Sequence, residues 1–175
     1  MGKIKKSPEM QIKRDIKILH LFERPEFTST LVHWFMDEWE PYYGRTGPGN
    51  AKKDLEACAG QDALPICLIA LDDRDRLLVT IALKETSVGS ELDVGPWLAA
   101  LLVDLQYQGR GVGPVLIEAI ATEAARLGFK KIYTSGQPDD KIFQSQGWRP
   151  YGETTSLRGP LIVYERELTY KGQVH

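Results

Sequence analysis

The sequence predicts a mixed α/β domain, and three observations point to this fold class. Apolar runs of strand length alternate with amphipathic segments of helix length. The predicted order is one strand, two helices, three strands, a helix, a strand, a helix and a last strand, which is typical of mixed α/β folds. A length of 175 residues suits one domain. We therefore expect a single domain over residues 15–170, preceded by a basic and frayed lead over residues 1–14.

The first part of the chain is predicted to hold one strand and two helices. Ile16 to Leu21 is a short apolar run, which is typical of a strand. An amphipathic helix is predicted to open at Pro25 and to end at Pro41, because apolar side chains recur at every fourth residue. A loop rich in turn residues follows over 42–49, and a second short helix is predicted over 51–58. The side chains that share one face of the first helix are Phe27, Leu31, Phe35 and Trp39.

Three strands are predicted next. Ile66 to Leu71 and Leu77 to Lys84 are apolar and are separated by the turn-like run Asp72 to Asp75, so we expect an antiparallel hairpin. A polar connection over 87–95 leads to the continuous apolar run from Trp97 to Val103. Such a run is typical of a strand that is buried on both faces.

The remaining elements alternate between helix and strand. Pro114 to Leu127 predicts a helix with proline in its first turn, and Gly128 lies just past its end. Lys131 to Thr134 predicts a strand, Asp139 to Ser145 a short helix, and Ile162 to Leu168 the last strand.

The composition excludes several classes of protein. Apolar residues make up 42% of the chain and charged residues 26%, which is ordinary for a folded globular domain. A spanning helix needs about 20 apolar residues in a row, so no membrane segment is expected. The net charge of −2 argues against a nucleic-acid partner. Cys58 and Cys67 are too few for a disulfide framework, so we expect a reduced, cytoplasmic protein. His20 and His33 have no second ligand at zinc spacing, so no metal site is expected.

The segment most informative about function is a glycine loop between the buried strand and the long helix. Val103 ends the strand, glycines recur over 109–113, and Pro114 stands in the first turn of the helix. Glycines let the backbone approach a ligand closely, and the free amides of a helix start attract an anion. The loop therefore predicts a pyrophosphate cradle, to which Arg110 adds a positive charge.

Three phosphate-binding patterns compete for this assignment. The dinucleotide pattern needs glycine where Pro114 stands, and the P-loop pattern fails because residues 44–49 are not followed by lysine and a hydroxyl. The pattern [QR]xxGx[GA] is satisfied by Gln108, Gly111 and Gly113. A glycine-rich turn that binds no ligand remains the alternative.

This loop, with its strand and helix, resembles the coenzyme A signature of the GNAT superfamily of acetyl-CoA-dependent N-acetyltransferases. The resemblance extends over residues 16–168 in element order. The segment 95–99 (GPWLA) resembles the strand entry of one subgroup, and 143–148 (FQSQGW) resembles a family segment near the C-terminus. The resemblance implies a mixed, mostly antiparallel sheet flanked by helices, with a splayed strand pair that holds coenzyme A. The residues it implies for the cofactor are Leu101, Leu102, Val103, Gln108, Gly109, Arg110, Gly111, Val112, Gly113 and Phe143.

The resemblance also implies direct attack of an amine on the acetyl thioester. A backbone amide near Leu102 or Val103, with Val103 preferred, is expected to hold the thioester oxygen. Many family members protonate the departing thiolate with a tyrosine, but this chain has Phe143 at the matching position. Tyr133, Tyr151 or a bound water are the alternatives for the acid.

The sequence also leaves several candidates for the general base. One branch of the family has a glutamate at the start of the strand before the loop, where this chain has Trp97. Glu91 and Asp93 lie just upstream and could act through water, and Asp104 at the strand end is a further candidate.

By resemblance, residues 27–58 form one wall of the acceptor groove. Residues 15–96 carry 8 basic and 15 acidic side chains, so we expect a cationic small molecule or a peptide amine as acceptor. A non-catalytic coenzyme A binding module is the alternative, supported by Phe143, and a nicotinamide-dependent oxidoreductase has only the glycines in its favour. The assembly state is open between a monomer and a homodimer. The residues expected to bind the acceptor are Trp34, Glu38, Tyr42, Tyr43 and Trp97.

Overall fold

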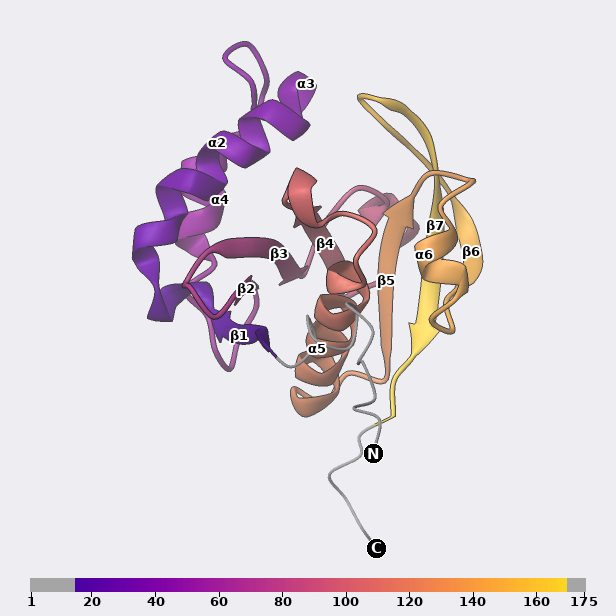
Figure 1. The fold of residues 1–175 in the computed structure, drawn as a ribbon. Helices are drawn as coiled ribbons and strands as arrows, with labels where there is room; N and C mark the ends of the chain where they lie inside the picture. The colour runs from indigo at the N-terminus through magenta and orange to yellow at the C-terminus, as the bar shows by residue number, and fades with distance from the viewer. Residues whose placement is uncertain (1–14, 170–175) are drawn as a thin grey trace, which may run out of the picture.

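A seven-stranded sheet forms the centre of the computed structural model, which describes residues 15–169 (Figure 1). The strand order is β1-β2-β3-β4-β5-β7-β6, and every neighbouring pair is antiparallel except β4 and β5. This arrangement confirms the predicted mixed α/β class with a mostly antiparallel sheet. The predicted lead over residues 1–14 lies outside the described residues. The strands are β1 (Lys17–His20), β2 (Ile66–Leu71), β3 (Leu77–Lys84), β4 (Trp97–Val103), β5 (Lys131–Gly136), β6 (Arg149–Ser156) and β7 (Gly159–Glu167).

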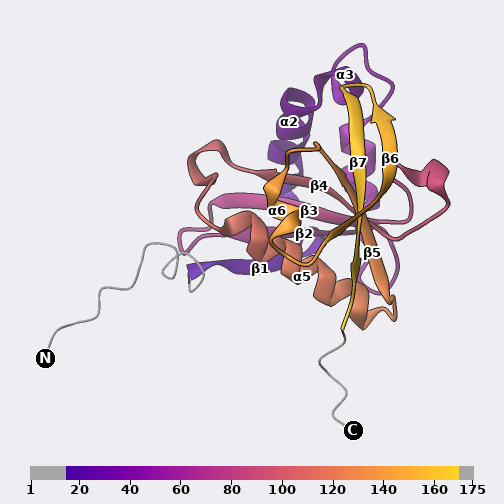
Figure 2. The same cartoon turned by 90° about the vertical axis from the view of Figure 1, so that its right-hand side faces the viewer.

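Helices cover both faces of the sheet (Figures 1 and 2). Helices α2 and α4 pack against one face of the first strands, and α5 packs against the other face. None of the helices within residues 15–169 is long and apolar enough to cross a bilayer. The helices are α2 (Thr28–Glu38), α3 (Glu40–Tyr43), α4 (Ala51–Ala57), α5 (Val112–Arg126) and α6 (Lys141–Gln144), with short 3-10 turns at Leu21–Glu23, Pro25–Phe27, Ser90–Leu92 and Leu105–Tyr107.

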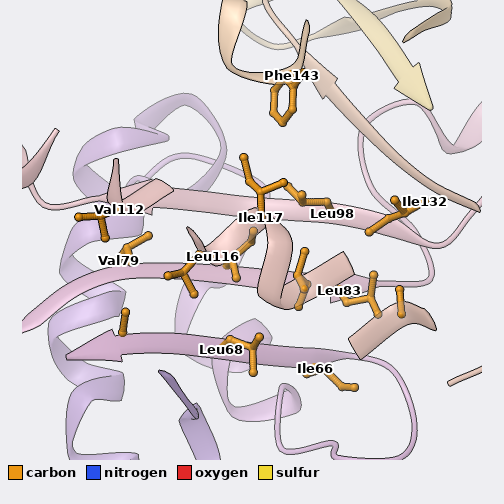
Figure 3. Packing of buried hydrophobic residues seen from close by; sticks show 14 of the residues in the cluster. Ile66, Leu68, Val79, Leu83, Leu98, Val112, Leu116, Ile117, Ile132 and Phe143 are labelled. Carbon is orange, nitrogen blue, oxygen red and sulfur yellow. The ribbon is translucent and has the colours of Figure 1, made fainter. Parts of the chain in front are cut away.

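The larger hydrophobic core lies between α5 and the sheet (Figure 3). Buried apolar residues of α5 recur at intervals of three or four, so one helix face meets the strands along its whole length. Leu98 of β4 and Ile132 of β5 both belong to this core. A second core lies on the opposite face, where Leu31 and Phe35 of α2 and Leu55 of α4 pack against β2. The α5 residues in the larger core are Val112, Leu116, Ile117, Ile120 and Ala124.

The predicted first helix is interrupted before its predicted end. Helix α2 stops at Glu38, and Trp39 adopts the non-helical angles φ −116° and ψ 48°. Pro41 does not end the helix as predicted, because it stands in the first turn of α3, where a missing N–H costs no hydrogen bond. Tyr42 and Tyr43 are therefore helical, and the predicted loop begins only at Gly44.

One strand was absent from the sequence prediction. Strand β6 pairs with β7 along its whole length, although it contains Pro150 and Gly152, and most of its side chains are exposed. As an outer strand it needs no continuous apolar run, so its sequence carries little strand signal. Burial of β4 on both faces was also predicted too broadly: Trp97 and Leu98 are buried, but the strand is partly exposed from Ala99 onward.

Leu116 offers a direct test of the α5 core. Its side chain is fully buried, so Leu116→Ala is expected to lower the free energy of unfolding by about 2–5 kcal/mol through lost contacts and a cavity. Urea denaturation followed by circular dichroism measures this change. Thr122→Ala, on the exposed side of the same helix, is the control and is expected to stay within about 0.5 kcal/mol of the parent. Equal effects of the two substitutions would contradict the assigned core.

Candidate functional site

Strands β4 and β5 part almost immediately after they meet. Their parallel ladder contains a single register pair, Trp97 with Tyr133, which the Tyr133 N–H supports by donating to the Pro96 carbonyl at 2.9 Å. The Thr134 hydroxyl adds a bond of 3.0 Å to the Leu98 carbonyl. Beyond these contacts β5 pairs only with β7, over six register positions. The backbone of β4 therefore faces a gap in the middle of the sheet.

A β-bulge in β4 changes which side chains face α5. The register with β3 shifts between Thr80 and Ala82, and Ala100 has a positive φ of 54°. A bulge inserts one unpaired residue and reverses the alternation of side chains beyond it. Leu101 and Val103 consequently pack on the α5 side of the sheet. A non-glycine residue at positive φ is strained, and such strain is concentrated at functional sites.

The peptide groups beyond the bulge differ in direction. The Asp104 N–H donates to the Leu78 carbonyl of β3 at 2.8 Å. Because hydrogen bonds alternate along an antiparallel pair, Leu102 also directs its N–H to β3, whereas Val103 directs its peptide groups toward the gap. The Gln108 side-chain amide donates to the Val103 carbonyl at 3.2 Å, which agrees with this direction. Of the two amides expected to hold the thioester oxygen, only that of Val103 is free to meet a ligand in the gap.

A cleft of about 690 Å³ opens between the parted strands and the helices above them. One wall is α3 with the end of β3 and the segment that follows it. The opposite wall is β5, α6 and the turn between β6 and β7. Residues Leu98 to Leu101 of β4 line the floor. The cleft thus joins the gap in the sheet to the wall that the sequence predicted for an acceptor.

The glycine loop lies where β4 ends and α5 begins. Gly109 and Gly111 have φ values of +74° and +81°, and a Cβ added at either would meet no atom within 4 Å. Gly111 immediately precedes α5, so the first amides of that helix lack partners within the helix. The Arg110 guanidinium lies 5.5 Å from the centroid of the Tyr107 ring. Free amides and a nearby cation suit a phosphate group. The ideal Cβ of Gly113 would lie 3.4 Å from Ile142, a lining residue, so the loop adjoins the cleft.

Phe143 lines the cleft at the position where the family tyrosine was expected. It is buried, extends from α6 toward the larger core (Figure 3), and packs edge-on against Trp148 and beside Tyr164. The Tyr164 hydroxyl donates to the Gln137 carbonyl at 3.4 Å, and burial raises the pKa of Tyr164. Phe143 thus brings an aromatic surface to the cleft and no acidic proton.

None of the five acid and base candidates, Tyr151 included, lines the cleft. Tyr133 is buried between Trp97 and Tyr151, with ring centroids 5.9 and 5.4 Å away, and this burial raises its pKa. Glu91 accepts a hydrogen bond from the Thr154 hydroxyl, and that bond lowers the pKa of the carboxyl group. Asp93 is exposed in the connection before β4. Asp104 accepts from the Gln106 N–H at 2.9 Å and so caps the turn after β4.

The predicted acceptor residues fall into two groups. Tyr42 and Tyr43 line the cleft, and the Tyr43 hydroxyl donates to Asp54 at 2.7 Å. Burial and the Asp54 carboxylate raise the pKa of Tyr43. Trp97 does not line the cleft, because its ring is fully buried and its Nε1–H donates to the Val94 carbonyl at 2.8 Å. Trp34 packs against the second core and does not line the cleft.

Glu38 does not line the cleft but contacts Arg158, which does. Its backbone carbonyl accepts from Arg158 at 3.3 Å, and its carboxylate lies 3.7 Å from the same guanidinium. Arg158 stands in the turn between β6 and β7, so this contact connects the two walls across the cleft. Sequence reasoning missed both Arg158 and Lys84, the last residue of β3, as lining residues. The polar end of an otherwise apolar run was the only signal at Lys84. Within residues 15–169, no three histidine, cysteine or acidic side chains gather in an arrangement that could hold a metal.

Comparison with known proteins gives one family. The model of the acetyltransferase (GNAT) family matches residues 28–147, more than half of the chain. Curated protein sequences give no match. Solved structures share the fold at low sequence identity. An aminoglycoside 6'-acetyltransferase type Ii has a TM-score of 0.68 and 19% identity, over 89% of this chain and 99% of that chain. An aminoglycoside 6'-N-acetyltransferase complexed with coenzyme A has a TM-score of 0.68 and 18% identity, over 90% and 99%. An acetyltransferase of the GNAT family from Staphylococcus aureus Mu50 has a TM-score of 0.66 and 14% identity, over 88% and 99%.

Alanine substitutions at two glycines test the loop conformation. Gly111→Ala is expected to lower the free energy of unfolding by about 1–2 kcal/mol, because an L-residue at this positive φ is strained. Gly113→Ala is the matched control: its φ is not positive and it lies inside α5, where alanine is favoured over glycine by about 0.5–1 kcal/mol. Urea denaturation of both variants measures the difference. A Gly111→Ala variant as stable as the parent would contradict the assigned conformation.

Proposed function

The chain belongs to the GNAT acetyltransferase family, and from this membership we propose that it transfers the acetyl group of acetyl-CoA to a primary amine. The observation that carries the proposal is the parting of β4 from β5 beside a glycine-rich helix start. An extended thioester ligand would find unpaired strand amides at one end of this site and unpaired helix amides at the other end. The cleft continues the gap, so an amine can approach the same point from the opposite side.

The residues of the gap fit coenzyme A. In the proposal, the peptide groups of Leu101 bond the pantetheine arm, the Val103 N–H meets the thioester, and the amides of 109–113 with Arg110 hold the pyrophosphate. Gln108 keeps the Val103 peptide in place through its bond to the carbonyl. Phe143 and Ile142 give the arm an apolar surface.

Catalysis is proposed to rest on position and on one backbone donor. Acetyl-CoA supplies an acetyl group that is activated as a thioester. The Val103 N–H donates to the thioester oxygen as negative charge grows there, and a donor of this kind is usually the largest catalytic contribution. The cleft holds the amine nitrogen against the carbonyl carbon, which removes much of the entropic barrier.

Both proton transfers are proposed to pass through water. The amine must lose a proton before attack, and the thiolate must gain one after the acetyl group leaves. Glu91, Asp93 and Tyr133 lie outside the lining of the cleft, so each could exchange a proton with it only through bound water.

The acceptor is proposed to be a small-molecule or peptide amine. The names of the structural neighbours and the acidic composition of residues 15–96 support a cationic amine. The charged side chains that line the cleft itself are, by contrast, mostly basic. We further propose that residues 15–170 act as one domain in the cytoplasm, where the free thiols of Cys58 and Cys67 stay reduced.

A non-catalytic coenzyme A binding module is the second candidate, and one observation favours it. Phe143 occupies the place of the expected tyrosine and supplies no proton. A binding module needs the gap and the glycine loop but no proton transfer. Turnover therefore separates the two candidates, whereas binding of coenzyme A does not.

The proposed activity predicts that acetyl-CoA releases free thiol only when an amine is present. A thiol reagent follows this release, and calorimetry measures the binding of coenzyme A. Arg110→Ala is expected to weaken coenzyme A binding by about tenfold, the loss of one charge-assisted bond. Lys52→Ala, an exposed charge on α4, is the control and is expected to bind coenzyme A like the parent. Binding without turnover across a broad amine panel would favour the binding module, and absence of binding would refute both candidates.

Phe143→Tyr tests the missing acid. If protonation of the thiolate limits turnover, a phenol at this position is expected to raise kcat by about tenfold or more. The gain should disappear at alkaline pH as the phenol ionises. Phe143→Leu removes the ring without adding an acid, so it is the control and should give no gain. An unchanged kcat in Phe143→Tyr would show that proton delivery by water is not limiting.

A further inference from the structure

The charged side chains that line the cleft are mostly basic. Lys84 lies on the wall formed by α3 and the end of β3, Arg158 lies on the opposite wall, and the one carboxylate among the described lining residues is Asp140. Asp140 accepts from the Ile142 N–H and so caps α6, on the opposite wall. Most of the acidic residues that give the first half of the chain its negative charge lie outside the lining of the cleft. In the acidic cluster at the end of α2, Glu38 contacts Arg158 through both its carbonyl and its carboxylate.

Lys84 is the cation in the cleft whose charge is not balanced. Within residues 15–169, the lysines that form ion pairs are Lys17, Lys52 and Lys131. Arg158, by contrast, is held by Glu38. Lys84 is half-buried at the end of β3, where all preceding residues of the strand are buried. A partly desolvated ammonium without a counter-ion is costly, and an anionic ligand would lower that cost.

The place of Lys84 separates it from the phosphates of the cofactor. It stands opposite Trp97, the first residue of β4, whereas the glycine loop follows Val103 at the other end of this strand. Six residues of strand span about 20 Å, so Lys84 cannot serve the pyrophosphate cradle. The proposed acceptor, which would occupy the cleft that Lys84 lines, is the ligand within its reach.

The surroundings of Lys84 are those of the acceptor wall. Tyr43 lines the same wall and donates its hydroxyl to Asp54 at 2.7 Å, and no ion pair joins that carboxylate to Lys84. A hydrogen bond from Cys67 is the main cause that lowers the pKa of the Cys58 thiol, and the positive charge of Lys84 adds to it. Thr86 and Ser87, which also line the cleft, follow Lys84 in the chain and add hydroxyl donors.

We propose that Lys84 binds a carboxylate of the acceptor, so that the substrate is an amine carrying a carboxylate a few atoms from its nitrogen, such as a small amino acid. This inference rests on the proposed acetyl transfer and narrows it to a substrate class. Lys84 is a specificity residue here: it holds the acceptor and takes no part in proton transfer. The carboxylate meets the Lys84 ammonium inside the cleft, and the amine is directed along the cleft toward the thioester.

The test compares three amines of equal length: β-alanine, β-alaninamide and the corresponding diamine, with an aminoglycoside as a large cation. Thiol release from acetyl-CoA gives kcat and KM for the parent, Lys84→Met, Lys84→Arg and the surface control Lys52→Met. The parent should prefer β-alanine over its neutral amide. Lys84→Met should reduce kcat/KM for β-alanine by about 10- to 100-fold, the range of a bond between charged groups, mainly through KM. Lys84→Arg should restore part of the loss, and Lys52→Met should match the parent.

Several outcomes would overturn the proposal. These are a parent that prefers the diamine or the aminoglycoside, a Lys84→Met variant that acetylates β-alanine as well as the parent does, and acetylation of Lys84 itself detected by mass spectrometry. Calorimetry of β-alanine with the coenzyme A complex supplies a second readout. If no amine is turned over, the acetyltransferase proposal fails, and selective binding of β-alanine by the parent but not by Lys84→Met would still support the carboxylate site. Equal binding by both would refute it.

Discussion

The parting of β4 from β5 is the constraint on which the rest of the structure depends. Two neighbouring strands inside a sheet normally satisfy each other's peptide groups, and here they share one register pair. The separation is maintained because β4 stays paired with β3 and β5 stays paired with β7. Helix α5 packs across both strands, since its core contains Leu98 from β4 and Ile132 from β5. The opening therefore costs backbone hydrogen bonds without dividing the hydrophobic core.

The bulge at Ala100 works together with this opening. A regular strand would place Leu101 and Val103 on the other face, away from α5. With the extra residue, their side chains contribute to the α5 core, and the Val103 peptide is left facing the gap. Side-chain packing thus fixes the direction of a backbone donor, which a mobile side chain could do less accurately. Gln108 secures the same peptide from the loop side.

The sequence predicted the sheet strands that are apolar and the helices that are amphipathic, because burial leaves a periodic pattern. The bounds of β2, β3 and β4 agree with the prediction at both ends. The pattern fails where burial is slight, as in β6, and where a proline can stand in a first turn, as at Pro41. For the candidate site, short motifs indicated the glycine loop and Phe143, which lines the cleft. They could not show that Trp97 is enclosed by the core, nor that Lys84 and Arg158 meet from distant segments, because both depend on tertiary packing. Composition misled for a related reason: the total charge of a segment does not determine which of its charges face a cleft.

Strand β6, the element without a sequence signal, has a consequence for the behaviour of the protein in concentrated solution. An outer strand exposes unpaired peptide groups that can recruit another chain. Here the strand carries Pro150, which has no N–H, and its register shifts between Pro150 and Gly152, so its outer edge is neither regular nor fully hydrogen-bonding. The opposite outer strand, β1, is only four residues long. Both margins of the sheet are thus poor templates for strand addition, so a sheet opened at its centre is protected from aggregation at its edges.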